Sequence, residues 1–193
     1  MSPWIAKAVV VASTMLLIAI PAYVHRAHGR PNIVENRKGP RERILLALVG
    51  LGFLPALLWV ATPVFAFSDL PLRVLPFLNG VAGVAFGLAL LYRSHADLGA
   101  NWSVTLEVRE QHRLVTHGIY RTVRHPMYLA LLLYGVGQAV LIPNWIAGPP
   151  YLIALAILFA LRVRPEERMM REQFGHEYDA YASKTRRLVP GLW

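Results

Sequence analysis

The side chains best suited to chemistry lie in one polar stretch, His112 to Tyr128, directly before an apolar run. Keeping polar groups at the edge of a membrane segment costs free energy, so such groups usually serve a function. Three histidines, His112, His117 and His125, raise the question of a metal site, but their spacing lacks the i, i+4 pairing of common helical zinc motifs. We therefore expect no metal. The arginines of the stretch favour an anionic ligand, because a planar guanidinium can bind two oxygens of a carboxylate or phosphate at once.

The composition indicates a membrane protein that crosses the bilayer several times. Of the 193 residues 55% are hydrophobic, and the mean hydropathy is +0.42. Five apolar runs are long enough to be considered as transmembrane helices: about 3–24, 44–67, 74–92, 127–142 and 145–161. The sequence therefore predicts an all-α, polytopic membrane protein with five transmembrane helices, forming a single domain over residues 1–193. A Gly50-Leu51-Gly52 triplet follows no strand, so it lacks the context of a dinucleotide-binding fingerprint.

The basic residues are distributed unevenly between the loops. The net charge of +9 could suggest a nucleic-acid partner. However, the arginines and lysines gather after the first and third runs and in the tail, whereas the loop between the second and third runs has only Arg73. The positive-inside rule then predicts an outside amino terminus and a cytoplasmic carboxyl terminus. The positive charge faces anionic lipid headgroups, and no nucleic-acid partner is expected.

The last two apolar runs are short and separated only by Pro143-Asn144, which predicts a tight helical hairpin. At 1.5 Å per residue, the first of them reaches about 24 Å, less than the roughly 30 Å of a hydrocarbon core. Bilayer thinning or burial against other helices must compensate.

A further helix is predicted to begin at Pro165, because proline suits the first position of a helix and disfavours helical geometry in the residue before it. Its apolar face consists of Met170, Phe174, Tyr178 and Tyr181. We expect an amphipathic helix at the cytoplasmic surface, or one folded as a lid over the hairpin.

Together these residues carry a family resemblance. The stretch His112 to Tyr128 contains the patterns H-x-L-V, G-I-Y and R-H-P-x-Y, and one hairpin later come Arg162, Glu166-Glu167, Phe174-Gly175 and Tyr178. With residues 97–103 and 187–190, this combination resembles the isoprenylcysteine carboxyl methyltransferase family over roughly the carboxyl-terminal half. The resemblance implies an integral membrane enzyme that transfers a methyl group from S-adenosylmethionine to the carboxylate of a lipid-like substrate. Such an enzyme leaves S-adenosylhomocysteine and a methyl ester as products. It binds the cofactor without a Rossmann domain, within about residues 93–193.

The resemblance also assigns roles to individual positions. It gives cofactor contacts to His112, Leu114, Val115, Tyr120, His125, Pro126, Met127, Tyr128 and Glu166. It makes Arg162 the catalytic, substrate-binding residue that holds the carboxylate. A carboxylate is ionised at neutral pH, so its methylation needs no general base. Pro126 suits the start of the fourth helix, whose free amides can receive the cofactor's carboxylate.

Ordinary membrane-protein roles are also open to these charged residues. Arg162 can simply extend to the membrane surface, and Glu166 and Glu167 are favourable charges in the first turn of a helix. The acceptor implied by the resemblance is an isoprenylcysteine. Because this chain has only five predicted spans where eukaryotic members have more, a fatty acid or an isoprenoid acid is an equally open acceptor. The expected partner is a membrane lipid or lipidated acceptor at the cytoplasmic face. The alternatives are methylation of a phospholipid amine, which needs an uncharged nitrogen, and a lipid-binding membrane protein without enzymatic activity.

Overall fold

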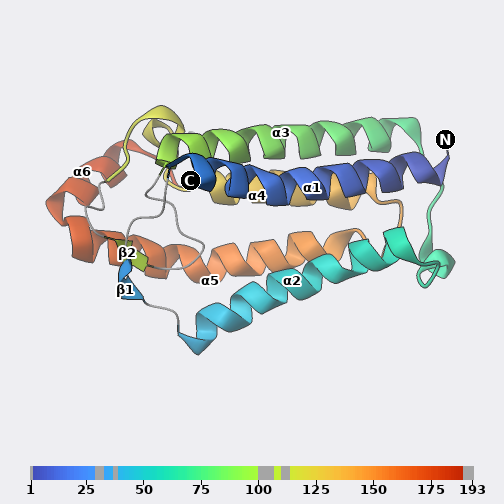
Figure 1. Ribbon diagram of the computed structural model, residues 1–193, viewed down its shortest axis with the longest axis horizontal. Coiled ribbons are helices and arrows are strands. Elements are labelled where there is room, and N and C mark those ends of the chain that lie inside the picture. Colours follow the sequence, from blue (N-terminus) through green and yellow to red (C-terminus); the bar gives the residue numbers. More distant parts are fainter. Residues whose placement is uncertain (1, 29–32, 37–38, 100–106, 110–113, 189–193) are drawn as a thin grey trace.

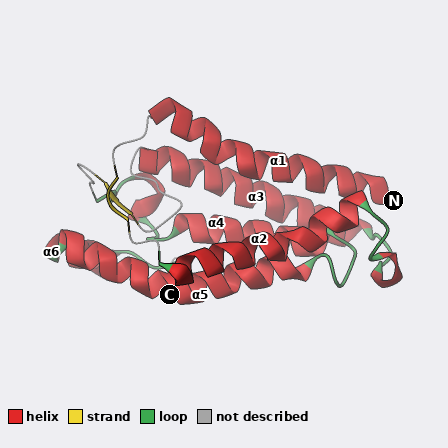
Figure 2. Ribbon diagram, turned by 60° about the horizontal axis from the view of Figure 1, so that its bottom comes forward, coloured by secondary structure: helices red, strands yellow, loops and turns green. Residues whose placement is uncertain are grey.

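Five long helices run alongside one another in an elongated bundle, shown in Figures 1 and 2. The computed structural model describes residues 2–28, 33–36, 39–99, 107–109 and 114–188. The long helices are α1 (Pro3–His28), α2 (Pro40–Ala61), α3 (Val74–Leu98), α4 (Pro126–Leu141) and α5 (Pro149–Phe174). The short elements are β1 (Ile33–Asn36), η1 (Ala66–Ser68), β2 (Glu107–Arg109), η3 (Gly118–Arg121) and α6 (His176–Lys184).

Each of the five predicted apolar runs corresponds to one long helix, and three of these helices are long and apolar enough to cross a membrane. These three are Pro3–Val24, Pro40–Ala61 and Val74–Leu98, while α4 is a shorter apolar helix. The all-α prediction missed one feature, the antiparallel pairing of β1 with β2. Strands of four and three residues are too short to show an alternating pattern in the sequence.

The predicted helix boundary at Pro165 is wrong, because α5 continues through this proline to Phe174. Proline cannot donate to the carbonyl four residues earlier, which here is Leu161. Arg41 of α2 extends its Nη2 to that carbonyl oxygen, at 3.4 Å, and so replaces the missing donor. The chain instead turns at Gly175, whose φ of 51° favours glycine, and α6 folds back from the end of α5 (Figure 1).

The turn between α4 and α5 is longer than predicted, since α5 begins at Pro149 and not at residue 145. Asn144 organises this turn: its Oδ1 accepts hydrogen bonds from the amides of Ile146 (3.0 Å) and Ala147 (2.8 Å). Amides that would have begun a helix earlier are thereby bound in the turn.

Glycines bring α3 and α4 into backbone contact. A Cβ atom on Gly87 would lie 2.6 Å from the backbone nitrogen of Tyr134, and one on Gly83 would lie 2.9 Å from the Cα of Gly137. The hydroxyl of Tyr134 also lies 3.2 Å from Ser13 Oγ of α1. Helix α4 is therefore enclosed by its neighbours, which compensates for its short length.

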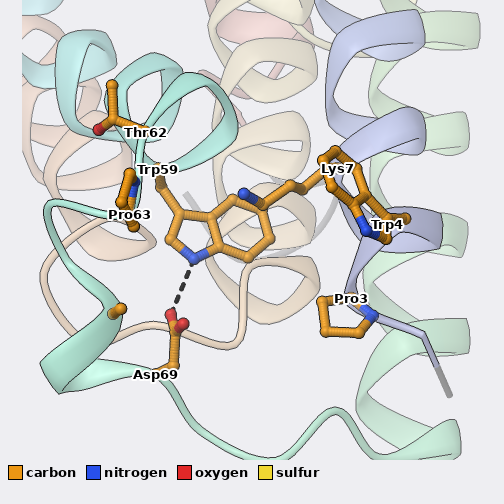
Figure 3. A pocket seen from close by; sticks show the side chains of 8 residues that line it. Pro3, Trp4, Lys7, Trp59, Thr62, Pro63 and Asp69 are labelled. Atoms are coloured by element: carbon orange, nitrogen blue, oxygen red, sulfur yellow. Dashed lines mark hydrogen bonds between the residues drawn. The ribbon is translucent and has the colours of Figure 1, made fainter.

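The bundle end that carries the amino terminus has its own set of polar contacts (Figure 3). Trp59 Nε1 donates to Asp69 (2.9 Å), and Asn144 Nδ2 donates to the same carboxylate (2.7 Å). The ammonium of Lys7 lies 5.3 Å from the ring centroids of both Trp4 and Trp59, a cation-π arrangement. A cavity of about 220 Å³ lies among Lys7, the two tryptophans and Asp69. These contacts connect α1, α2 and the 142–148 turn, and none of the residues is a predicted site residue.

The glycine contact between α3 and α4 gives a stability prediction. We expect Gly87→Ala to destabilise the protein by about 1–3 kcal/mol, because the new methyl group can fit only if two backbones separate. Thermal unfolding in detergent, followed by tryptophan fluorescence, measures this effect. Gly50→Ala is the matched control, since nothing lies within 4 Å of a Cβ there. Equal melting temperatures for the two variants would contradict the close packing.

Candidate active site

The predicted site residues on α4 and α5 meet at the bundle end opposite Lys7. His125 precedes α4, Tyr128 lies in its first turn, and Glu166 lies on α5. Phe159, also on α5, joins them although the sequence did not predict it as a site residue. The ring of Tyr128 is 5.6 Å from that of His125 and 5.3 Å from that of Phe159, between centroids. The hydroxyl of Tyr128 donates a hydrogen bond to Glu166 Oε2 at 2.7 Å. We call His125, Tyr128, Phe159 and Glu166 the aromatic-carboxylate cluster.

Arg162 lies one helical turn before Glu166 and is buried, with its side chain 9% exposed. Its Nη2 forms an ion pair with Glu42 Oε1 of α2 at 3.1 Å, and the Glu42 side chain is 7% exposed. A surface role in which the guanidinium extends into water is therefore wrong for Arg162. Glu42 was not among the predicted site residues, because it lies outside the predicted second run (44–67) and its partner is far along the chain.

Glu167 forms a second buried ionic cluster beside the first. Its carboxylate accepts hydrogen bonds from Arg124 Nε (3.1 Å) and from Arg187 Nε and Nη2 (3.1 and 3.0 Å). His125 Nε2 approaches Oε1 at 3.5 Å. Arg124 also donates to the carbonyls of Ala182 and Thr185. Glu167 thus joins α5, the start of α4 and the segment after α6, so its role is structural, and Arg124 is engaged inside the protein.

The environment of Glu167 keeps its carboxyl ionised. Burial alone would raise the pKa of Glu167, but the contacts with His125 and Arg187 and the charge of Arg124 outweigh burial and hold this pKa well below its usual 4.5.

Some of the backbone amides around the start of α4 already donate hydrogen bonds within the protein. The amide of Arg124 donates to the carbonyl of Arg186 (2.7 Å), and the amide of His125 donates to that of Arg187 (3.0 Å). Pro126 has no amide hydrogen. The donors that α4 can offer to an anion are therefore the amides of Met127 and Tyr128.

The other predicted cofactor residues lie in the segment before α4. Tyr120 is buried, its carbonyl accepts a hydrogen bond from Tyr181 Oη (2.7 Å), and its hydroxyl lies 3.4 Å from the carbonyl of Ser94. Burial, with the nearby Glu166 carboxylate, raises the pKa of Tyr120, so its hydroxyl stays protonated. Val115 is buried and Leu114 half-buried, whereas His112 lies outside the described residues.

Asp97 fixes the backbone of this segment. Its Oδ2 accepts a hydrogen bond from the amide of Ile119 at 2.8 Å, beside Gly118, whose φ is 58°. A side chain at Gly118 would collide with the Asp97 carboxylate. The G-I-Y motif therefore needs its glycine in order to hold Tyr120 between α3 and α6.

The arrangement offers two complementary environments on neighbouring turns of α5. Aromatic faces and the Glu166 carboxylate suit a cationic group, and Arg162 suits an anionic one. Among the residues that the structure describes, no three His, Asp or Glu side chains gather into a metal site.

The pKa of Glu167 gives a prediction for stability against pH. A carboxyl whose pKa is lowered in the folded protein stabilises it fully above the unfolded value of 4.5 and progressively less below it. We expect the melting temperature of the native chain to fall progressively as the pH drops below about 5. Glu167→Gln, which cannot titrate, should be less stable at neutral pH and show a shallower slope. Glu177→Gln, an exposed change on α6, should keep the native slope, and parallel slopes for all three proteins would refute the assignment.

Comparison with known proteins identifies the family of the chain. The family profile of the isoprenylcysteine carboxyl methyltransferases matches residues 80–172. A probable protein-S-isoprenylcysteine O-methyltransferase of Oryza sativa subsp. indica is 30% identical over 191 residues, covering 96% of both chains. The protein-S-isoprenylcysteine O-methyltransferase of Homo sapiens is 32% identical over 108 residues, which are 55% of this chain and 38% of the human one.

A solved structure shares the fold. The eukaryotic intramembrane Ras methyltransferase superposes with a TM-score of 0.53 over 82% of this chain and 55% of its own, at 24% sequence identity. The apolar helices and the full-length similarity to the rice protein confirm the resemblance seen in the sequence. The chain is a multi-pass membrane protein that belongs to the isoprenylcysteine carboxyl methyltransferase family.

Proposed function

We propose that the chain transfers a methyl group from S-adenosylmethionine to the carboxylate of a lipid-bearing acceptor at the cytoplasmic membrane face. Family membership identifies its class as a carboxyl O-methyltransferase. The observation that carries the proposal is a buried arginine, Arg162, one helical turn from the aromatic-carboxylate cluster. These two environments match the two charges that the reaction must bring together, a sulfonium cation and a carboxylate anion.

The cofactor's chemistry fits the residues around Tyr128. When bound, the cofactor supplies an electrophilic methyl group on a positively charged sulfur. The rings of His125, Tyr128 and Phe159 can stabilise a nearby cation. The Glu166 carboxylate, oriented by Tyr128, can accept hydrogen bonds from an amino or ribose hydroxyl group. The free amides of Met127 and Tyr128 can receive the carboxylate of the methionine part.

Arg162 then has a positioning task and no proton to move. The acceptor carboxylate is ionised at neutral pH, so its oxygen can attack the methyl carbon directly. With the cofactor bound, a carbon–oxygen bond would form as the carbon–sulfur bond breaks, and the electron pair of that bond would leave with the sulfur. Holding the two reactants in line, with water excluded by the surrounding helices, can supply about 7 to 11 kcal/mol of the barrier reduction.

The membrane arrangement that we propose has five spans, with the amino terminus outside. Its support is the burial of α4 between α1, α3 and α5, which lets a 16-residue helix reside within the bilayer region. The cofactor reaches the site from the cytoplasm, and the acceptor's apolar tail enters sideways from the lipid. An isoprenylcysteine is the first acceptor to test, followed by fatty and isoprenoid acids.

The role of Arg162 is tested by methyl transfer in detergent. With labelled cofactor and S-farnesyl-N-acetylcysteine, we expect Arg162→Gln to lower kcat/KM at least about 100-fold, equivalent to about 2.7 kcal/mol. Arg168→Gln, an exposed change on the same helix, should retain activity. The label should be released by base, as an ester requires. Base-stable methylamine would support the phospholipid alternative, and full activity of Arg162→Gln would exclude the assigned role.

The cofactor side is tested by calorimetry with S-adenosylhomocysteine. We expect Glu166→Gln to weaken binding roughly tenfold or more, because hydrogen bonds to a charged acceptor are worth about 1.5 to 3 kcal/mol. Tyr128→Phe keeps the ring but loses the hydroxyl that orients Glu166, so a smaller loss is expected. Glu177→Gln serves as the control. Native affinity in Glu166→Gln would remove this residue from the cofactor site.

A further inference from the structure

Two residues at the start of α2 contact two consecutive residues of α5. Arg41 Nη2 lies 3.4 Å from the carbonyl of Leu161, and Glu42 Oε1 lies 3.1 Å from Arg162 Nη2. The first contact provides a hydrogen-bond donor to the Leu161 carbonyl, which lacks its helical donor because Pro165 has no amide hydrogen. The second contact holds the Arg162 guanidinium. Under the proposed function, this guanidinium binds the acceptor carboxylate.

Glu42 places a carboxylate where the acceptor's own carboxylate must bind. Both side chains of the pair are more than nine-tenths buried, so neither charge is well solvated and each depends on the other. When the acceptor arrives, two carboxylates face one guanidinium in a poorly solvated site. Their mutual repulsion opposes binding of the acceptor anion.

We propose that Glu42 is a positioning residue that stands in for the acceptor carboxylate and competes with it for Arg162, an inference that rests on the proposed function. Methyl transfer converts the acceptor's anionic carboxylate into a neutral ester, while the sulfonium becomes a neutral thioether. After the reaction Glu42 is the carboxylate left facing Arg162, and the ion pair with Glu42 re-forms at full strength. Glu42 therefore weakens acid binding selectively and favours release of the ester.

This competition predicts an effect on the acid that the ester does not share. In Glu42→Gln the guanidinium loses the Glu42 carboxylate, and the acceptor carboxylate no longer competes with it. We expect KM for S-farnesyl-N-acetylcysteine to fall about tenfold, with a lower kcat because the ground state binds more tightly. The inhibition constant of the methyl ester product should stay within about twofold of the native value, as the ester carries no charge to pair.

Direct binding separates this inference from the proposed function. Calorimetry with the acid and the ester, in the presence of S-adenosylhomocysteine, measures the preference for the acid without any turnover. A larger acid preference in Glu42→Gln than in the native chain supports the competition, even if no methyl transfer is detected and the proposed function fails. An unchanged or smaller preference, in a variant with native circular dichroism, overturns it.

Glu42→Asp covers the case in which Glu42→Gln does not fold. The shorter side chain keeps the negative charge but lengthens the 3.1 Å contact, so the acid preference should rise by about two- to fivefold. An acid preference equal to that of the native chain would overturn the inference. Glu177→Gln, exposed on α6, is the control and should leave both the acid and the ester affinities unchanged.

Discussion

The structure depends on the pairing of charges that are buried at one end of an apolar helix bundle. A lone buried charge is too costly to keep, so each ionised side chain there must face an opposite one. Glu42 meets Arg162, and Glu167 meets Arg124 and Arg187. The first pair joins α2 to α5, and the second joins α5 to the start of α4 and to the segment after α6. The same constraint that stabilises this end also orients the groups available for catalysis.

The packing of α4 positions the residues that α4 contributes to the site. Because glycines of α3 admit the α4 backbone at contact distance, α4 lies deep among the other helices and its first turn faces α5. Tyr128 then reaches both Phe159 and Glu166. Stability and function are thus coupled through α4: a change that separates α3 from α4 also moves the aromatic-carboxylate cluster.

Sequence patterns could predict the helices, and the residues that they singled out at Tyr128 and Glu166 lie in contact. They could not predict the partners of individual charges. The apolar runs located α1 to α5, although the turn before α5 is longer than the runs indicated. The helix boundary predicted at Pro165 is wrong, because Arg41 of α2 donates a hydrogen bond to the Leu161 carbonyl that the proline leaves without a helical donor. Glu167 had an ordinary local interpretation and Glu42 lay outside the predicted second run, and the contacts of both involve arginines far away along the chain. Long-range pairing of this kind leaves no local signal in a single sequence.

The most direct test is an experimental structure of the protein with S-adenosylhomocysteine and S-farnesyl-N-acetylcysteine bound together. We predict the acceptor carboxylate about 3 Å from the Arg162 guanidinium. We also predict the sulfur of S-adenosylhomocysteine against the rings of Tyr128 and Phe159, on the side of Glu166. An acceptor carboxylate bound away from Arg162, with the Glu42 pair intact, would contradict the central claim that one buried guanidinium serves both carboxylates.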